Sequence, residues 1–159
     1  MKRNIIWFRR DLRISDHPAL LAAIENSDEI LPVFILDKAL IGKSGSKRLA
    51  YLGQSLRALD ESLKGALHVI AGDPVDVLQE LISRHGISEV HISAEYEPYG
   101  AARDARVEAA GIEFIRTGSP YAVAPGRVLK PSDETPYRVY TPFYKQWCAH
   151  GWRAPAATP

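Results

Sequence analysis

Five short apolar runs alternate with four helix-like segments, and this alternation restricts the chain to few folds. The runs are rich in β-branched and aromatic residues and are too short to be helices. Strands that alternate with helices form right-handed crossovers, which place the strands in parallel. We therefore predict an α/β fold with a doubly wound, five-stranded parallel sheet of the Rossmann-like, three-layer kind. Its strands are expected at residues 4–8, 30–36, 67–71, 89–93 and 112–116.

The segments between these runs carry signals for helix starts and ends. Pro18 and Pro74 follow polar residues and predict first turns, and Gly86 predicts the end of the helix that Pro74 begins. A fourth helix is expected from about Tyr99 to Gly111. In the second helix, leucines at steps of three and four predict an apolar stripe against the sheet. They are Leu49, Leu52, Leu56, Leu59 and Leu63.

Prolines also bear on the sheet and on the end of the chain. Pro32 lies within the second run and argues against a central position for that strand, unless it marks the first residue of the strand. After residue 118 the pattern changes to loops and then to a short helix, with Thr141 as the expected N-cap and Pro142 as its first residue. We expect an α/β ligand-binding domain over residues 1–130. Residues 131–159 then supply a loop, the short helix and the start of an interdomain linker.

The strand ends are where a ligand site is expected, because open α/β sheets bind ligands beyond the carboxyl ends of their strands. The sequence has neither a G-x-G-x-x-G nor a G-x-x-x-x-G-K-[ST] motif, which argues against a dinucleotide cofactor of the Rossmann type and against a P-loop nucleotide. Charged residues stand at these ends instead. They are Arg9, Arg10, Asp11, Asp37, Glu95 and Glu97.

The charged group after the first strand has two interpretations. It is either a structural lattice of arginine and aspartate or a wall of the ligand site. Arginine suits both, because its guanidinium pairs with carboxylates in a bidentate fashion. We expect Arg10 to face the ligand, Asp11 to belong to the lattice and Arg13 to be structural.

The acidic pair after the fourth strand, Glu95 and Glu97, points to one side if the backbone is extended. No nucleophile or metal partner stands nearby, so pairing with Arg10 or Arg48, or binding of a donor-rich ligand, is favoured over catalysis. Lys47 and Arg48 stand at the start of a predicted helix, where the helix dipole disfavours cations. They are either solvated charges or are offset by an anion or carboxylate.

The composition excludes several classes of function. A net charge of +1 gives no overall attraction to a polyanion, so this domain alone is not expected to form the main nucleic-acid surface. Cys148 is the only cysteine, which excludes an internal disulfide and is typical of a reducing compartment such as the cytoplasm. No segment is long enough for a signal peptide or a membrane span, and the five histidines lack metal-ligand spacing. We expect a cytoplasmic protein with no metal and no membrane partner.

Five motifs, in order and in register, carry a family resemblance. They are "WFRRDLRISDHPAL", "GSKRLAYLGQSLRALDESL", "GDPVDVL", "YEPYGAARDARV" and "PYRVYTPFYKQW". Together, over residues 4–152, they resemble the N-terminal domain of DNA photolyases and cryptochromes.

The resemblance implies the light-harvesting domain of a deoxyribodipyrimidine photolyase. In that family this domain holds an antenna chromophore, which passes excitation energy to FAD in a helical C-terminal domain for the repair of pyrimidine dimers. FAD and the surface for UV-damaged DNA would lie in that domain, outside this chain. The parent would be a carbon–carbon lyase, whereas this fragment alone is expected to be inactive and to contain no catalytic residue. The alternatives are a cryptochrome-type blue-light photoreceptor and a freestanding nucleotide-binding α/β module.

The resemblance also bears on which antenna is bound. Folate-binding members carry Asn-Glu where this chain has Tyr99-Gly100, and they have a histidine in the loop after the second strand, which this chain lacks. Members that bind an 8-hydroxy-5-deazaflavin carry residues similar to those found here, so that antenna is favoured over methenyltetrahydrofolate or FMN. The expected antenna-binding residues are Arg10, Phe34, Ile35, Leu36, Asp37, Arg48, Glu95 and Glu97.

Overall fold

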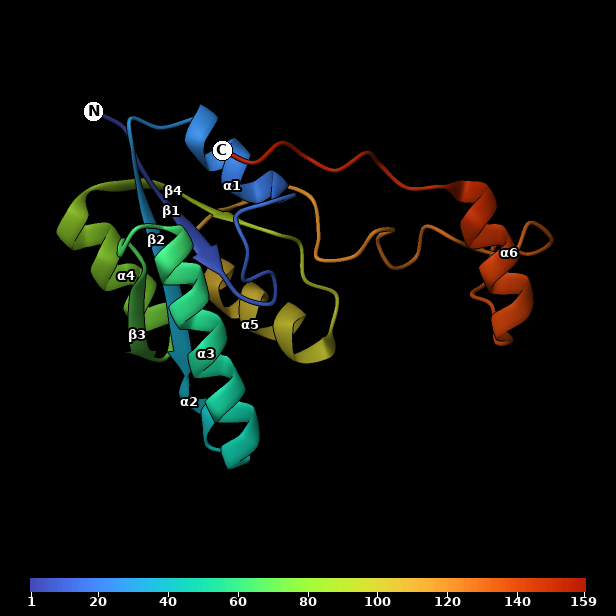
Figure 1. Ribbon diagram of the computed structural model, residues 1–159, viewed down its shortest axis with the longest axis horizontal. Coiled ribbons are helices and arrows are strands. Elements are labelled where there is room, and N and C mark those ends of the chain that lie inside the picture. Colours follow the sequence, from blue (N-terminus) through green and yellow to red (C-terminus); the bar gives the residue numbers. More distant parts are fainter.

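A computed structural model describes all residues, 1–159, and contains one five-stranded parallel sheet. The strand order is β3-β2-β1-β4-β5, which confirms the predicted doubly wound α/β fold (Figure 1). The strands are β1 (Arg3–Phe8), β2 (Glu29–Asp37), β3 (His68–Gly72), β4 (Ile87–Ile92) and β5 (Phe114–Arg116). The helices are α1 (Pro18–Glu25), α2 (Lys38–Ile41), α3 (Ser46–Ser62), α4 (Pro74–His85), α5 (Pro98–Ala109) and α6 (Tyr140–His150).

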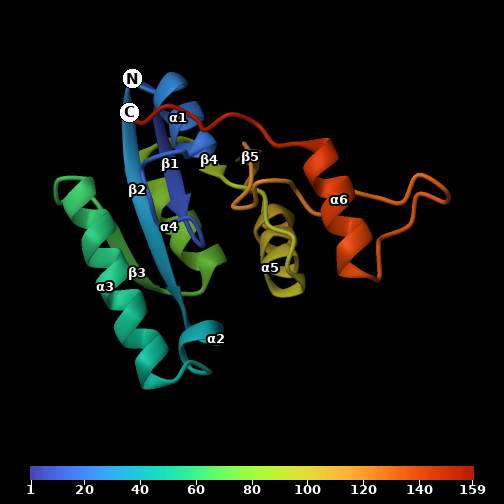
Figure 2. The ribbon, with the colours of Figure 1, turned by 45° about the vertical axis from the view of Figure 1, so that its right-hand side comes forward.

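Helices cover both faces of the sheet, and alternate residues of β1 point into the two resulting cores. Ile5 and Trp7 belong to the core beneath α4 and α5. Ile6 and Phe8 belong to the core beneath α1 and α3. Figure 2 shows α3 and α5 on opposite sides of the strands. This alternation follows from the two-residue period of a strand that is buried on both faces.

The predicted helix boundaries hold at α1 and α4. The Nδ1 atom of His17 accepts a hydrogen bond from the Leu20 amide and so caps α1. The Asp73 carboxylate caps α4 by accepting from the Val75 amide. Gly86 ends α4 at a φ of 63°, the left-handed conformation that glycine adopts without strain. The leucine stripe of α3 also faces the sheet, with Leu56 and Leu59 buried.

The expectation that Pro32 would keep its strand out of the sheet interior was wrong. β2 lies between β1 and β3, and Pro32 stands opposite Ile6 of β1. Pairing with β3 begins only at Val33, so β2 is still an edge strand where the proline occurs. A proline is tolerated there because no strand lies on that side to need its missing N–H.

The start of the last helix was also predicted wrongly. α6 begins at Tyr140 with Val139 at the N-cap, and no side chain caps it, so Thr141 is not the cap. Pro142 is its third residue, where a missing N–H costs little because the first amides of a helix have no partner within the helix. None of the six helices is both long and apolar enough to cross a bilayer.

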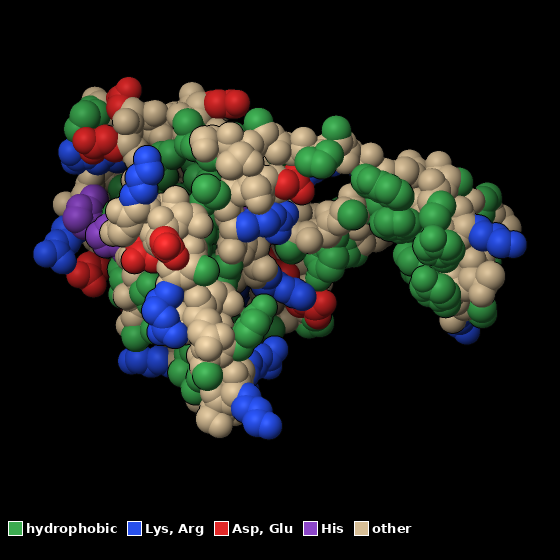
Figure 3. Space-filling view, viewed as in Figure 1, with side chains coloured by type: hydrophobic (Ala, Val, Ile, Leu, Met, Phe, Trp, Pro, Cys, Tyr) green, Lys and Arg blue, Asp and Glu red, His purple; other side chains and the backbone are tan.

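The C-terminal part stands away from the sheet and then returns to it. α6 has no buried residue and lies apart from the other helices in both ribbon views (Figures 1 and 2). The tail beyond it runs back toward α1, where the Ala156 amide donates to Asp16 at 2.8 Å and Arg153 pairs with the same carboxylate at 2.6 Å. Hydrophobic side chains gather on the α6 surface in Figure 3.

Candidate functional site

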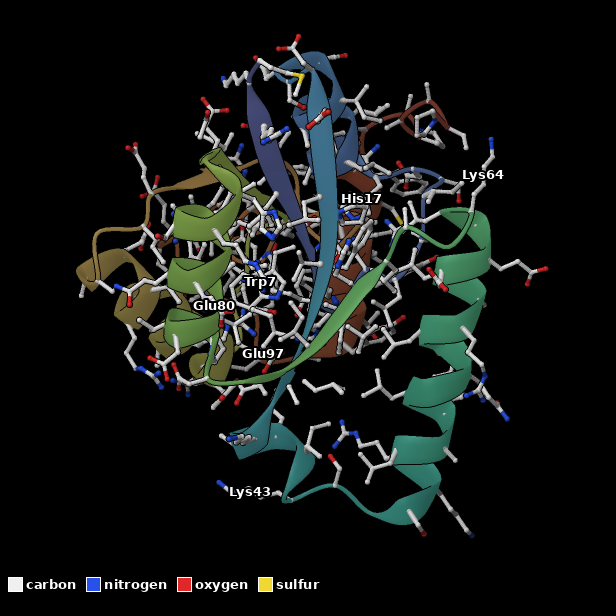
Figure 4. All side chains as sticks on the ribbon, turned by 90° about the vertical axis from the view of Figure 1, so that its left-hand side faces the viewer. Trp7, His17, Lys43, Lys64, Glu80 and Glu97 are labelled. Atoms are coloured by element: carbon white, nitrogen blue, oxygen red, sulfur yellow. The ribbon has the colours of Figure 1, made fainter.

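A pocket of about 490 Å³ opens at the carboxyl end of β2, between that strand, α2, α3 and the loop after β1. Nine of its fifteen lining residues are hydrophobic, as is usual in sites for small organic ligands. Figure 4 shows Lys43 in the loop that joins α2 to α3, beside this end of β2. The lining residues are Arg10, Leu12, Phe34, Ile35, Leu36, Asp37, Leu40, Ile41, Lys43, Ser44, Arg48, Leu49, Tyr51, Leu52 and Ser55.

Six of the eight residues expected to bind the ligand line this pocket. They are Arg10, Phe34, Ile35, Leu36, Asp37 and Arg48. Glu95 and Glu97 do not line it and instead lie within ion-pair distance of Arg10. The two carboxylates therefore pair with Arg10 rather than with Arg48, which makes no ion pair.

Asp37 is a buried carboxylate whose two oxygens both accept hydrogen bonds from the protein. Oδ1 accepts from the Ala39 amide at 3.0 Å and thereby caps α2. Oδ2 accepts from the Tyr99 hydroxyl at 2.5 Å. Burial, together with the hydrogen bond and the charge of Asp37, raises the pKa of Tyr99 to about 12. Asp37 is therefore held in one orientation at the edge of the pocket.

Arg10, which also lines the pocket, contacts two acids and an aromatic ring. Its Nη1 atom lies 3.4 Å from Glu95 Oε1 and 3.7 Å from Glu97 Oε1. Its guanidinium carbon lies 5.8 Å from the centre of the Tyr121 ring. The Tyr121 hydroxyl in turn donates to Glu97 at 3.4 Å. These contacts hold a half-exposed cation beside an apolar pocket.

Behind this wall the other charged residues form a buried lattice. Arg9 donates to both oxygens of Asp104 at 2.8 and 2.9 Å, and Arg103 donates to the same carboxylate at 2.8 Å. Both guanidinium carbons lie about 5 Å from the Trp7 ring. Burial lowers the pKa of Arg9, and the Asp104 charge opposes that effect. This lattice fixes the end of β1 against α5.

Asp11 belongs to the lattice, as expected from the sequence. Ser93 donates a hydrogen bond to its carboxylate, and His17 Nε2 lies 3.1 Å from the same oxygen. Burial alone would raise the pKa of Asp11, but the contacts with His17 and Ser93 outweigh it and hold the pKa far below its ordinary value. Arg13 contacts only the neighbouring backbone and Asp16, so it is structural.

Sequence reasoning missed several lining residues that come from α2, α3 and the loop between them. On α3, Tyr51, Leu52 and Ser55 follow Arg48 at helical spacing, so a search along the helix face from Arg48 would have found them. Lys43 had no such signal, because its place depends on the path of the loop. The pocket thus carries three cations, Arg10, Lys43 and Arg48, against the single carboxylate of Asp37.

Comparison with known proteins places the chain in one family. The family model described as DNA photolyase matches residues 4–159. The chain is 33% identical to a deoxyribodipyrimidine photo-lyase of Streptomyces griseus, over all of this chain and 37% of that protein. It is also 33% identical to Cryptochrome-2 of Gallus gallus, over 89% of this chain and 26% of that protein.

Solved structures show the same architecture. A class III photolyase from Agrobacterium tumefaciens superposes with a TM-score of 0.82 at 33% identity, over the whole chain and 34% of that structure. An archaeal photolyase from Sulfolobus tokodaii, described with two FAD molecules and a novel light-harvesting cofactor, gives a TM-score of 0.83 at 26% identity, over 98% of this chain and 37% of that structure. The chain thus spans little more than a third of the photolyases it matches. It belongs to the DNA photolyase and cryptochrome family, in which it corresponds to the N-terminal α/β domain.

Proposed function

We propose that this chain is the antenna domain of a cytoplasmic, light-driven DNA repair photolyase. The observation that carries the proposal is the pocket at the carboxyl end of β2, which is largely apolar and has a cationic rim. It lies where an open α/β sheet is expected to bind its ligand. A flat aromatic chromophore suits apolar walls that carry a few oriented polar groups.

We favour an 8-hydroxy-5-deazaflavin as the ligand. The residues proposed to hold it are those of β2 from Phe34 to Asp37, with Arg10 and Arg48 at the rim. Such a chromophore, when bound, would supply absorption of light and transfer of excitation energy to FAD. The residues of this chain bind it, orient it and shield one side of it from water.

A methenyltetrahydrofolate antenna fits the site less well. The folate-binding members of the family that this chain resembles carry an Asn-Glu pair at the positions of Tyr99 and Gly100. Here the Tyr99 hydroxyl engages Asp37, and the space above Gly100 is filled by the Glu95 side chain. Neither position offers a carboxylate or amide oxygen of its own to the amino group of a pterin.

The remainder of the proposed protein would include an FAD-binding helical domain that also binds UV-damaged DNA. The photolyases matched are almost three times as long as this chain, which supports the presence of such a part. α6 exposes Tyr140 and Tyr144, and the exposed Trp152 follows just after the helix. We propose that these aromatic side chains pack on that domain. On its own, the 159-residue chain repairs no DNA.

Reconstitution of the chain with candidate chromophores tests the antenna assignment. Purified chain is incubated with 8-hydroxy-5-deazariboflavin, FMN or methenyltetrahydrofolate, and the pigment retained after gel filtration is quantified. We expect retention of the deazaflavin. Tight binding of the folate with no uptake of deazaflavin would refute the assignment. Retention of FMN alone would identify FMN, in place of the deazaflavin, as the antenna.

A cryptochrome-type photoreceptor is the second candidate, because similarity to the Gallus gallus cryptochrome covers 89% of this chain. The two candidates share this domain and differ in activity. The test is an assay of thymine-dimer repair under blue light, using the protein that carries this domain together with its FAD domain. Repair supports the photolyase, whereas no repair with FAD fully reduced supports the photoreceptor.

A further inference from the structure

Gly100 is the third residue of α5, and the side chain of Glu95 lies over it. A Cβ atom at position 100 would lie 2.0 Å from Glu95 Cγ and 2.7 Å from Glu95 Cδ. Real Cβ atoms do not approach neighbours so closely, so any residue other than glycine would force Glu95 to move. Glycine at this position therefore creates the space that Glu95 occupies.

Glu95 is buried in that space, yet it does not reach the pocket. Its side chain is 5% exposed and is absent from the pocket lining. Its closest cation is Arg10, whose Nη1 atom lies 3.4 Å from Glu95 Oε1. Arg10 does line the pocket. A charge-assisted contact of this kind restricts the orientation of the guanidinium. Glu95 can therefore influence a bound ligand through the position of Arg10.

We infer that Gly100 and Glu95 form a positioning pair that sets Arg10 on the pocket wall, and through Arg10 determines ligand selectivity. The inference rests on the proposed function, since it assigns these residues a role in binding at the same pocket. Glu95 is thus a positioning residue and makes no contact with the ligand. Gly100 acts one step further back, by leaving room for Glu95.

The pair also affects which functional groups the pocket favours on the edge of a ligand. Asp37, the only carboxylate of the pocket, already accepts a hydrogen bond at each oxygen. Arg10, held by Glu95, adds donors to a rim that already carries Lys43 and Arg48. The pocket therefore favours a flat ligand whose edge carries carbonyl or anionic oxygens, and it disfavours one whose edge carries amino groups.

Glu97 provides a matched control. It is also a glutamate within ion-pair distance of Arg10, at 3.7 Å, but its side chain is 59% exposed. None of its atoms lies close to the position that a Cβ at Gly100 would take. Exposed pairs of this kind contribute little to binding or stability. If Glu95 acted only by adding negative charge near Arg10, Glu97→Ala would have a comparable effect.

The test is a set of double-mutant cycles on the 159-residue chain, with the Kd for 8-hydroxy-5-deazariboflavin measured by fluorescence titration. We expect Gly100→Ala and Glu95→Ala each to weaken binding about tenfold. Glu97→Ala should change it by less than about twofold. In the Glu95→Ala background Gly100→Ala should have no further effect, because the clashing side chain is gone. In the Arg10→Ala background Glu95→Ala should likewise have none.

Each outcome decides the inference. If Glu95→Ala weakens binding equally with and without Arg10, Glu95 contacts the ligand directly and the inference is wrong. If Gly100→Ala acts equally with and without Glu95, the proposed steric role of Gly100 is wrong. Should Gly100→Ala fail to fold by circular dichroism, the Arg10 and Glu95 cycle decides alone. If the unmodified chain binds neither the deazaflavin nor FMN, the proposed function fails and the inference falls with it. If the chain binds but the effects of the single substitutions simply add in the double mutants, only the inference is overturned.

Discussion

The Tyr99 hydroxyl donates a hydrogen bond to Asp37 Oδ2 and so joins the start of α5 to the end of β2. The two residues are 62 positions apart in the sequence, and no local pattern connects them. The contact completes the hydrogen bonding of a carboxylate that also caps α2. It holds the polar edge of the pocket in place before any ligand binds.

Replacement of Tyr99 by phenylalanine should remove this contact with little change in shape. The ordinary pKa of tyrosine is 10.0, and in this chain it is raised to about 12 for Tyr99 by burial and Asp37. The neutral phenol therefore contributes stability that is fully present below pH 10 and lost as the pH rises toward 12. The free energy of unfolding should fall more steeply over this range in the unmodified chain than in Tyr99→Phe.

Urea unfolding at several alkaline pH values measures this difference, and phenolate absorbance provides an independent check. A tyrosine ionisation step near pH 12 should be present in the unmodified chain and absent from Tyr99→Phe. Tyr51→Phe is a suitable control, because Tyr51 is exposed and makes no side-chain hydrogen bond. Loss of this step in the control as well would contradict the assignment.

Asp11 should govern acid stability. Its pKa is held below the ordinary 3.8, because the contacts with His17 and Ser93 outweigh its burial. A lowered pKa means that the carboxylate contributes stability above about pH 4, which is lost as the pH falls further. Asp11→Asn should lower the free energy of unfolding by about 1–3 kcal/mol at pH 7. It should also make that free energy depend less on pH between about pH 4 and 2. Urea unfolding at several acidic pH values measures this, and the same pH dependence in Asp11→Asn as in the unmodified chain would contradict this role.

Asp104 should be among the least replaceable residues. Asp104→Ala would leave the buried guanidiniums of Arg9 and Arg103 without a counter-charge, at an expected cost of about 3–5 kcal/mol. The matched control is Glu108→Ala, which breaks the half-exposed pair with Arg116 and should cost less than about 1 kcal/mol. Urea unfolding measures both, and equal costs would show that the lattice is not a structural requirement.

Two glycines should respond in opposite directions to the same substitution. Gly53 lies within α3, and a Cβ there would meet only the Arg57 guanidinium at 3.7 Å, so Gly53→Ala should stabilise the chain by about 0.5–1 kcal/mol. Gly86 has a φ of 63°, so Gly86→Ala should destabilise it by about 1–2 kcal/mol. Thermal unfolding distinguishes the two, and a lower Tm for Gly53→Ala would contradict the account of α3.

The fold could be predicted from the sequence because its signals are local. Alternating apolar runs, prolines in first turns and the glycine at the end of α4 each act within a few residues. Pro32 misled because its effect depends on where β3 begins to pair, which is a property of the sheet. The start of α6 was misplaced because no side chain caps that helix.

The site could be predicted only in part, for the same physical reason. Strand-end residues such as Arg10 and Asp37 meet at one edge because the strands are parallel. By contrast, the contact between Tyr99 and Asp37 and the placement of Glu95 over Gly100 arise only when α5 packs against the sheet. Glu95, which the sequence suggested as a ligand-binding residue, does not line the pocket and pairs with Arg10, which does.

The central claim is that the pocket between β2 and α3 holds the chromophore, and filling that pocket tests it most directly. Ser55 lines the pocket, whereas its neighbour Gln54 is exposed and does not. The measurement is the Kd for 8-hydroxy-5-deazariboflavin in the unmodified chain, in Ser55→Trp and in Gln54→Trp. We predict that Gln54→Trp binds like the unmodified chain and that Ser55→Trp binds at least about tenfold more weakly. Equal affinity in all three proteins would show that the chromophore binds elsewhere.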